Sequence, residues 1–216
     1  MTFAPRFEAL PEPQRALWPE LAALSAKHVL YGGTALALRL GHRHSIDFDF
    51  FSHEPLDPRE LAELPWLRGS TTLQESPNTR TVLVERGGTP IKVSLFGAIT
   101  FGRVGEPELA DGVVRVASAL DLAGTKIKAL LQRVEAKDYL DVDALLASGV
   151  SLASVLGAGR ALFGDAFNPI VARKALTYFV GGDLGTLDNT VRDRLTTAAT
   201  NDLLVESVAL ASARLD

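Results

Sequence analysis

The spacing of hydrophobic residues changes near residue 117. Residues 28–117 contain short apolar runs separated by glycine and proline, a pattern typical of β-strands joined by turns. From residue 118 onward, apolar side chains recur at helical spacing, and glycines fall where helices would end. The pattern predicts an α+β (mixed α/β) chain in two parts. Residues 1–117 would form a small mixed β-sheet with helices, and residues 118–216 a C-terminal helical half.

The same spacing assigns individual elements. Strands are expected at residues 28–31, 46–51, 71–74, 80–85, 90–97 and 113–117. Helices are expected at residues 11–26, 34–40, 58–64, 118–133, 138–147, 152–163, 169–180 and 189–213. Asp57 and Asn168 each precede a proline, so we expect both to cap the helix that follows. Gly87 and Gly88 predict the tight turn of a hairpin.

Composition adds that the chain is an ordinary globular protein. Of its 216 residues, 47% are hydrophobic and 22% are charged, and none is cysteine. The lack of cysteine excludes disulfides, cysteine nucleophiles and thiolate metal sites, and it favours a reducing, cytoplasmic compartment. No apolar run reaches the roughly 18 residues of a membrane span, and the first residues lack the apolar core of a signal peptide. We therefore expect no membrane association.

The charge balance limits how the protein could contact nucleic acid. The formal net charge of −4 is spread evenly along the chain, so no general electrostatic attraction to RNA or DNA is expected. Contact would require a local basic patch. The candidate residues for such a patch are Arg39, Arg43, Lys126, Lys128, Arg133 and Lys137.

Two aspartates stand two residues apart in an expected strand. Residues i and i+2 of a strand share a face, so Asp47 and Asp49 would project together, about 7 Å apart. Ile46, Phe48 and Phe50 would then face the core. A divalent cation, Mg²⁺ or Mn²⁺, would relieve the repulsion between the two carboxylates. The alternative is a solvated strand face that carries two acids.

A glycine pair precedes these aspartates. Gly32, Gly33 and Thr34 stand between an expected strand and an expected helix. Glycine lets the backbone approach a phosphate, and the N-terminus of a helix offers unpaired N–H groups. Thr34 adds a hydroxyl, although an ordinary turn is the alternative. A phosphate cradle followed by a carboxylate pair predicts a site for a metal–nucleotide complex.

Together these residues resemble a known family. The Gly-Gly-Thr of residues 32–34, followed by the Asp-Phe-Asp of residues 47–49, is similar to the opening signature of the polymerase-beta-like nucleotidyltransferase fold. The full stretch of residues 32–51 resembles the AbiEii/AbiGii toxin-type nucleotidyltransferase family, the toxins of type IV toxin–antitoxin systems. A second stretch, residues 118–146, resembles that family's Asp-Leu-Ala…Lys helix and its Lys-Asp-x-x-Asp motif. The resemblance covers about residues 28–147.

The resemblance implies roles for residues of the second stretch. Lys126 matches the family's helix lysine, and Lys137, Asp138 and Asp141 match its last motif. A lysine there is suited to holding triphosphate oxygens, with Lys128 as the weaker choice. Asp138 and Asp141 share a helix face, although acids also favour the first turn of a helix through its dipole alone.

One position departs from the usual pattern of two-metal nucleotidyl transfer. A third carboxylate on a neighbouring strand normally activates the attacking hydroxyl. In the strand expected at residues 90–97, that position holds Ser94. Either Asp138 or Asp141 would then take the base role, or the protein transfers slowly or only binds nucleotide.

Two histidines raise a third possibility. His42 and His44, close in sequence to the aspartate pair, would suit a metal-dependent hydrolase, with zinc as the metal. Arg43 between them disfavours a cation, so we expect His42, Arg43 and Ser45 to form a polar rim near phosphates. Arg39 either extends along its helix or reaches a substrate phosphate. Four aromatic residues are expected in the core, namely Trp18, Trp66, Phe163 and Tyr178.

The predicted function is Mg²⁺-dependent transfer of a nucleotidyl group from an NTP to an acceptor hydroxyl, with the helical half completing the active-site cleft. The residues expected to bind the nucleotide are Gly32, Gly33, Thr34, Arg43, Ser45 and Lys137, and those expected in catalysis are Asp47, Asp49, Lys126 and Asp138. By the resemblance, the acceptor is RNA, with tRNA first. A cognate antitoxin would restrain the activity without necessarily touching the toxin.

Overall fold

The computed structural model describes residues 2–216, which fold into two compact units. The first unit comprises residues 2–102, Glu106–Ser118 and Ser212–Asp216. The second comprises Arg103–Gly105 and Ala119–Ala211. The chain therefore passes between the units more than once, and its last five residues return to the first unit.

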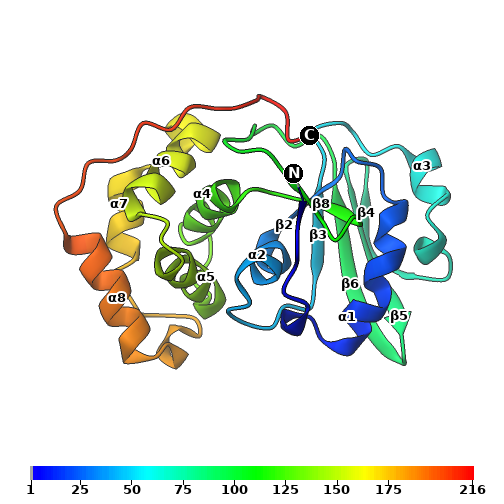
Figure 1. Cartoon of the computed structure of the whole chain (residues 1–216), viewed down its shortest axis with the longest axis horizontal. Helices are drawn as coiled ribbons and strands as arrows, with labels where there is room; N and C mark the ends of the chain where they lie inside the picture. The colour runs from blue at the N-terminus through cyan, green and yellow to red at the C-terminus, as the bar shows by residue number, and fades with distance from the viewer. Residues whose placement is uncertain (1) are drawn as a thin grey trace. The chain divides into compact units, whose positions relative to one another are not determined.

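An eight-stranded mixed sheet forms the centre of the first unit (Figure 1). Its strands are β1 (Thr2–Phe3), β2 (Val29–Tyr31), β3 (Phe48–Phe51), β4 (Thr71–Ser76), β5 (Thr79–Arg86), β6 (Thr89–Phe96), β7 (Glu108–Ala110) and β8 (Val114–Val116). Their order in the sheet is β1-β7-β8-β2-β3-β6-β5-β4. The strand β3 lies between β2, which is antiparallel to it, and β6, which is parallel. The fold class expected from the sequence is confirmed.

Short helices accompany the sheet, and their boundaries follow local chemistry. They are α1 (Glu12–Leu17), α2 (Gly32–Leu40) and α3 (Pro58–Ala62), with 3₁₀ turns at Phe7–Ala9, Trp18–Ala23 and Pro65–Leu67. The single helix expected at residues 11–26 is wrong in its second half, where the chain continues as a 3₁₀ turn. Pro19 has no N–H to donate to the preceding α-helical turn, so α1 ends before it.

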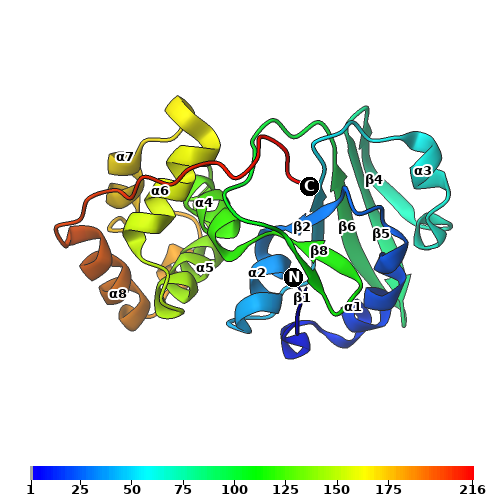
Figure 2. The same ribbon diagram turned by 45° about the horizontal axis from the view of Figure 1, so that its top comes forward.

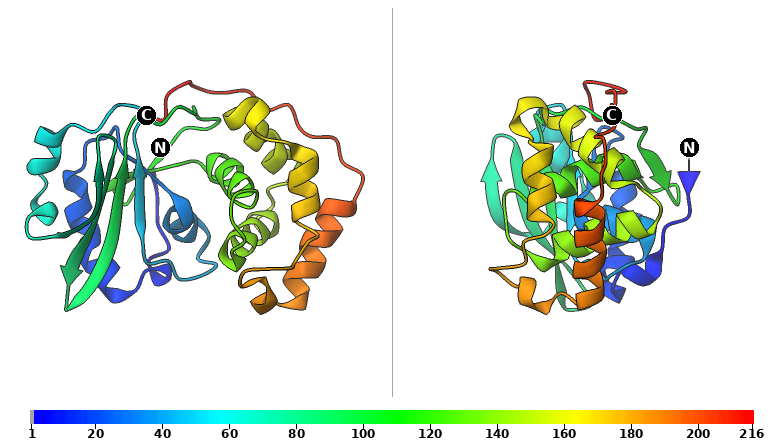
Figure 3. Two further views of the ribbon diagram at one scale, coloured as in Figure 1. Left: turned by 180° about the vertical axis from the view of Figure 1, so that it is seen from behind. Right: turned by 90° about the vertical axis from the view of Figure 1, so that its left-hand side faces the viewer.

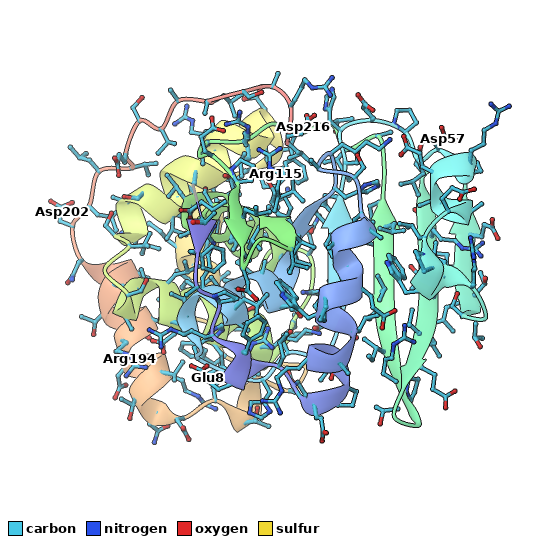
Figure 4. The ribbon with its side chains drawn as sticks, turned by 45° about the vertical axis from the view of Figure 1, so that its right-hand side comes forward. Glu8, Asp57, Arg115, Arg194, Asp202 and Asp216 are labelled. Carbon is cyan, nitrogen blue, oxygen red and sulfur yellow. The ribbon has the colours of Figure 1, made fainter. Side chains whose placement is uncertain are left out.

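Turn and cap predictions in the first unit are confirmed. Asp57 accepts a hydrogen bond from the backbone N–H of Arg59 at 2.9 Å and so caps α3, at whose start it stands in Figure 4. Gly87 and Gly88 both have positive φ, at 59° and 75°, and join β5 to β6 (Figure 3). Such φ values are open to glycine at little cost and match the twist of a two-residue hairpin.

Phe48 and Phe50 anchor the core beneath β3. Both are fully buried, and the Phe48 ring lies 6.3 Å from the ring of Trp18. Trp18 and Trp66 are also buried, so two of the four expected core aromatics are confirmed. Ile46, expected on the same face, is instead 58% exposed. The reason is that β3 begins only at Phe48, so strand alternation does not extend back to Ile46.

Five helices build the second unit (Figure 1). They are α4 (Ala119–Ala129), α5 (Ala136–Ala147), α6 (Leu152–Phe163), α7 (Pro169–Ala175) and α8 (Asn189–Thr200), with 3₁₀ turns at Gly164–Ala166 and Leu184–Thr186. Asn168 caps α7 through bonds from the N–H groups of Ile170 and Val171, as expected. Tyr178 lies beyond the end of α7 and is 63% exposed, so its expected core position is wrong. Phe163 is only half-buried.

The last expected helix, residues 189–213, is also too long. The helix α8 ends at Thr200, and the chain then runs in an extended conformation past α6 (Figure 2). Arg173 holds the turn by donating to the carbonyls of Ala199 and Asn201. A Cβ at Gly157 would collide with the Glu206 carbonyl, so this glycine allows the extended segment to lie directly against α6.

In residues 2–216, no helix combines the length and apolar character needed to cross a membrane.

We predict that Phe48→Ala destabilises the protein by about 3–5 kcal/mol, because it leaves a cavity under the central strand. Ile46→Ala, two residues earlier but exposed, should change the free energy of unfolding by less than about 0.5 kcal/mol. Urea unfolding of both variants measures the difference. Equal losses would mean that the two side chains do not differ in burial as the strand boundary requires.

Candidate active site

The end of β2 brings a glycine against an aspartate. Tyr31 is paired with Asp49 across the β2–β3 ladder, and the chain then turns directly into α2 at Gly32. Gly32 has φ +74°, and a Cβ there would lie 2.9 Å from Asp49 Oδ2. Both the left-handed backbone and the close carboxylate exclude a larger residue. The first glycine of the predicted cradle therefore sets the position of the second predicted metal ligand.

The second glycine lies under a guanidinium. A Cβ at Gly33 would collide with the Arg43 guanidinium and would lie 3.3 Å from Ser45 Oγ. Arg43 Nη1 donates to the His44 carbonyl at 3.0 Å, which fixes the side chain along its own loop. The first turn of α2, whose N–H groups lack helical acceptors, is thus bordered by a fixed positive charge.

Thr34 differs from its predicted role. Its side chain was expected to face a phosphate, but Thr34 is 1% exposed, with its Oγ1 2.8 Å from Ser45 Oγ. The same oxygen contacts the Asp47 carbonyl. The hydroxyl therefore fastens the loop that carries Asp47 to α2, and only the backbone of Thr34 remains for an anion. Ser45 is likewise buried.

Asp49 and Asp47, which immediately precedes β3, each lie next to a residue of β6. The parallel register pairs Asp49 with Ser94, and Phe48 with Val93. Asp47 Oδ2 forms an ion pair of 2.8 Å with Lys92 Nζ, and both side chains are partly exposed. Ser94, 3% exposed, occupies the position opposite Asp49 where a third carboxylate was looked for. The departure noticed in the sequence is thus present at this face.

The donor set suits one divalent cation. The carboxylates of Asp47 and Asp49 are oxygen ligands of the kind that Mg²⁺ and Mn²⁺ prefer. Among residues 2–216, no three histidine, aspartate or glutamate side chains are grouped so as to hold a metal together. The histidine–aspartate zinc centre considered from the sequence is therefore not assembled. Asp47 and Asp49 would be the protein's ligands to a single ion.

Arg39 is engaged elsewhere in the first unit. Its Nε donates to the Ala117 carbonyl at 2.8 Å, and its Nη1 pairs with Glu108 at 2.7 Å. The guanidinium carbon also lies 4.4 Å from the centre of the Phe3 ring. These contacts tie α2 to β1, β7 and the end of β8, so Arg39 has a structural position rather than a place beside the glycines.

The second unit holds its own charged cluster. Lys126 of α4 is 5% exposed, and its Nζ lies 3.0 Å from Asp138 Oδ1 and 2.6 Å from Asp141 Oδ2, both on α5. The two carboxylates are fully buried. Arg133 adds two hydrogen bonds to Asp138, at 2.6 and 2.9 Å. The i, i+3 spacing of the acids and the lysine of α4 thus form one buried network.

This network decides how Asp138 titrates. Burial alone would raise the pKa of Asp138, but the hydrogen bonds from Arg133 and the charge of Lys126 outweigh it, and the pKa is lowered. A carboxylate with a lowered pKa is a weak proton acceptor. Lys137 and Lys128 lie outside the network. Lys137 pairs with Glu135 at 2.7 Å, and Lys128 donates to the Ala166 carbonyl beside the Phe163 ring.

The sequence reasoning assigned no contact to two charged residues that form defined contacts in the structure. Lys92 was placed on its strand without a function, although its spacing of two from Ser94 puts both on one face. Asp121 lies in the helix expected at residues 118–133, where its sequence position indicates no further role. It is 1% exposed and accepts bonds from the N–H groups of Val104 and Gly105 at 2.7 and 3.2 Å. No local sequence pattern predicts the contact of Asp121 with Val104 and Gly105, because these residues are distant from it in sequence.

The fold and this arrangement define a nucleotidyltransferase-type protein, and comparison with known proteins agrees. Residues 15–203 match the family described as "Nucleotidyl transferase AbiEii toxin, Type IV TA system". The chain belongs to this family.

Solved structures show the same fold. MenT4, a nucleotidyltransferase toxin from Mycobacterium tuberculosis H37Rv, superposes with a TM-score of 0.58 at 16% identity, covering 88% of this chain and 82% of MenT4. JHP933 from Helicobacter pylori gives 0.51 at 20% identity, covering 86% and 91%. An uncharacterized protein of Aquifex aeolicus (strain VF5) is 31% identical over 139 residues, and the match spans 62% of this chain and 65% of that protein.

We predict that Lys126→Met destabilises the protein by about 3–5 kcal/mol, because two fully buried carboxylates lose their shared cation. Lys128→Met, with the same change of charge on the same helix, should cost less than about 1 kcal/mol, since its ammonium is exposed. Denaturant unfolding compares the two. A small loss for Lys126→Met would show that the carboxylates do not depend on this lysine.

We also predict acid sensitivity from Asp138. Its folded pKa lies below the unfolded value of about 3.9. The stability it contributes is therefore complete above that pH and is lost as the pH falls through the folded pKa. The stability difference between wild type and Asp138→Asn should shrink below about pH 4. Urea midpoints between pH 7 and 3 measure it, and a difference that stays constant with pH would contradict the assignment.

Proposed function

We propose that this protein transfers a nucleotidyl group from an NTP to an acceptor hydroxyl. The observation that carries the proposal is the meeting of the Gly32–Gly33 turn with Asp49 at the N-terminus of α2, beside Arg43. Such an arrangement can hold a triphosphate at one end and a cation at the other. Membership of the AbiEii family supports the same reaction.

The residues of the first unit would divide the work between binding and positioning. The N–H groups at the start of α2 would hold phosphate oxygens, and the Arg43 guanidinium would add charge and planar hydrogen bonds. Thr34 and Ser45 would keep Asp47 in place through their buried contacts. Asp47 and Asp49 would hold a Mg²⁺ or Mn²⁺ ion, which supplies charge neutralisation for the phosphates when bound.

The reaction itself would be an in-line displacement. The acceptor oxygen forms a bond to the α-phosphorus, the bond to the bridging oxygen breaks, and pyrophosphate leaves with that electron pair. The hydroxyl proton passes to water, since Ser94 offers no carboxylate opposite Asp49. Catalysis would thus rest on positioning and charge neutralisation.

The second unit contributes differently in this proposal. Lys126 and Asp138, with Asp141, would support the helices α4 and α5 through their buried pairing. Lys137, whose side chain is half-exposed, would remain available for phosphate. We propose RNA, and tRNA first, as the acceptor, which is what the resemblance in sequence implies. We also propose a type IV antitoxin as the factor that restrains the activity, and family membership supports it.

A second candidate function is nucleotide binding without transfer. The observation that favours it is Ser94, which leaves the site without a third carboxylate. This candidate predicts Mg²⁺-dependent NTP binding with no pyrophosphate released in the presence of any acceptor.

We predict that the double variant Asp47→Ala, Asp49→Ala loses incorporation of labelled NTP into total tRNA by at least about 1000-fold, because the cation is no longer held. Each NTP is tested in turn with Mg²⁺. Asp193→Ala, which removes an exposed aspartate from α8, is the matched control and should keep full activity.

A thermal melt of the double variant separates loss of the site from loss of the fold. The melting temperature should not fall, since both aspartates lie on a partly exposed face. Full incorporation by the double variant would refute the assignment of the site. Failure of the wild type with every NTP, together with Mg²⁺-dependent binding, would establish the second candidate.

A further inference from the structure

Lys92 forms an ion pair with Asp47, and the proposed function gives it no role. It belongs to β6, the parallel neighbour of β3, and stands two residues before Ser94. The β3–β6 register begins with Phe48 paired to Val93, and the Lys92 ammonium meets the Asp47 carboxylate immediately before it. Its place is thus fixed by the central ladder of the sheet.

The contact between Lys92 and Asp47 uses one oxygen of the carboxylate. Nζ lies 2.8 Å from Asp47 Oδ2, the distance of a charge-assisted hydrogen bond. The carboxylate can therefore face Lys92 with one oxygen and a cation with the other.

Ser94 and Lys92 together determine the formal charge of this centre. A centre with three carboxylates and two divalent ions carries a formal charge of plus one. Two carboxylates, one lysine and one divalent ion carry the same formal charge. Compared with the three-carboxylate centre, a serine opposite Asp49 removes one negative charge, and an ammonium in place of one divalent ion removes one positive charge. The formal charge that meets a triphosphate is therefore the same.

We propose that Lys92 takes the place of the second metal ion, so that this centre binds one divalent cation per chain. This inference rests on the proposed function, because it assumes that Asp47 and Asp49 hold the cation. Lysine suits the task because its ammonium is a compact point charge on a long side chain. Lys92 is thereby a positioning residue for Asp47 and a constant source of positive charge.

The competing role for Lys92 is that of a simple salt bridge that a metal displaces. A displaced lysine would leave both oxygens of Asp47 to ions, and a second ion could then enter at saturation. The two roles differ in the number of ions bound and in whether neighbouring ions couple magnetically.

Mn²⁺ alone, added to the full-length protein, tests the proposal. Electron paramagnetic resonance measures the number of bound ions, the apparent Kd and the coupling between ions. Five proteins are compared. They are the wild type, the single variant Lys92→Met, the control Lys174→Met, and two double variants. One double variant combines Lys92→Met with Ser94→Asp, and the other combines Asp47→Ala with Asp49→Ala. The control removes the same charge from an exposed position on α7.

We expect the wild type to bind one Mn²⁺ with the spectrum of an isolated ion. Lys92→Met should bind Mn²⁺ about tenfold more tightly, because a positive charge next to the ligand Asp47 is gone. Lys174→Met should match the wild type. Lys92→Met, Ser94→Asp should bind two ions with a coupled spectrum. Should the buried aspartate prevent that variant from folding, the number of ions bound by the wild type and their magnetic coupling still decide.

Two results would overturn the role of Lys92 while leaving the proposed function intact. They are two coupled ions in the wild type, or one ion whose affinity is unchanged in Lys92→Met. A third result would overturn the metal site and the role of Lys92 together. It is that the wild type binds no Mn²⁺, or that the double variant Asp47→Ala, Asp49→Ala binds Mn²⁺ as the wild type does. The incorporation assay then reports separately on nucleotidyl transfer.

Discussion

The candidate site depends on the pairing of β2 with β3. That ladder sets Tyr31 against Asp49, and the chain has no spare residue between Tyr31 and the start of α2. The carboxylate of Asp49 consequently lies where a side chain at Gly32 would be. A glycine in a left-handed conformation is the residue that satisfies both conditions. The proposed phosphate cradle and the proposed metal ligand are in this sense one structural feature.

Charge compensation is the second constraint, and the two units meet it in different ways. In the second unit, the fully buried Asp138 and Asp141 are matched by Lys126 and Arg133, which keeps the cost of burying carboxylates low. In the first unit, Asp47 and Asp49 are only half-buried, and water shares in their solvation. A partly solvated pair can exchange water for a cation, whereas a buried pair closed by protein groups is committed to structure. The degree of burial thus separates the carboxylates proposed to bind a cation from those proposed to support the helices.

Positions at the ends of elements show where local reasoning stops. The residues after Thr200 keep a helical spacing of apolar side chains, yet they run extended past α6, with Asp202 on this stretch in Figure 4. Gly157 makes room for that segment, and the Glu206 N–H donates to the Ala153 carbonyl. Contacts with α6 stabilise this segment more than the hydrogen bonds of an isolated helix would. Ile46 similarly continues the strand alternation of the sequence, but in the structure it stands before β3 begins and is exposed.

The sequence by itself determined the mixed α/β class, the glycine turn before α2, the aspartate pair, the Asp57 and Asn168 caps and the family. Each of these depends on neighbours within a few residues, whose geometry a local pattern records. Only the tertiary structure decided that Thr34 faces inward, that Arg39 joins β1 and β7, that Lys126 is enclosed by Asp138 and Asp141, and that Lys92 meets Asp47. These contacts join residues on different elements, and their partners are chosen by strand register and helix packing, which no local spacing encodes.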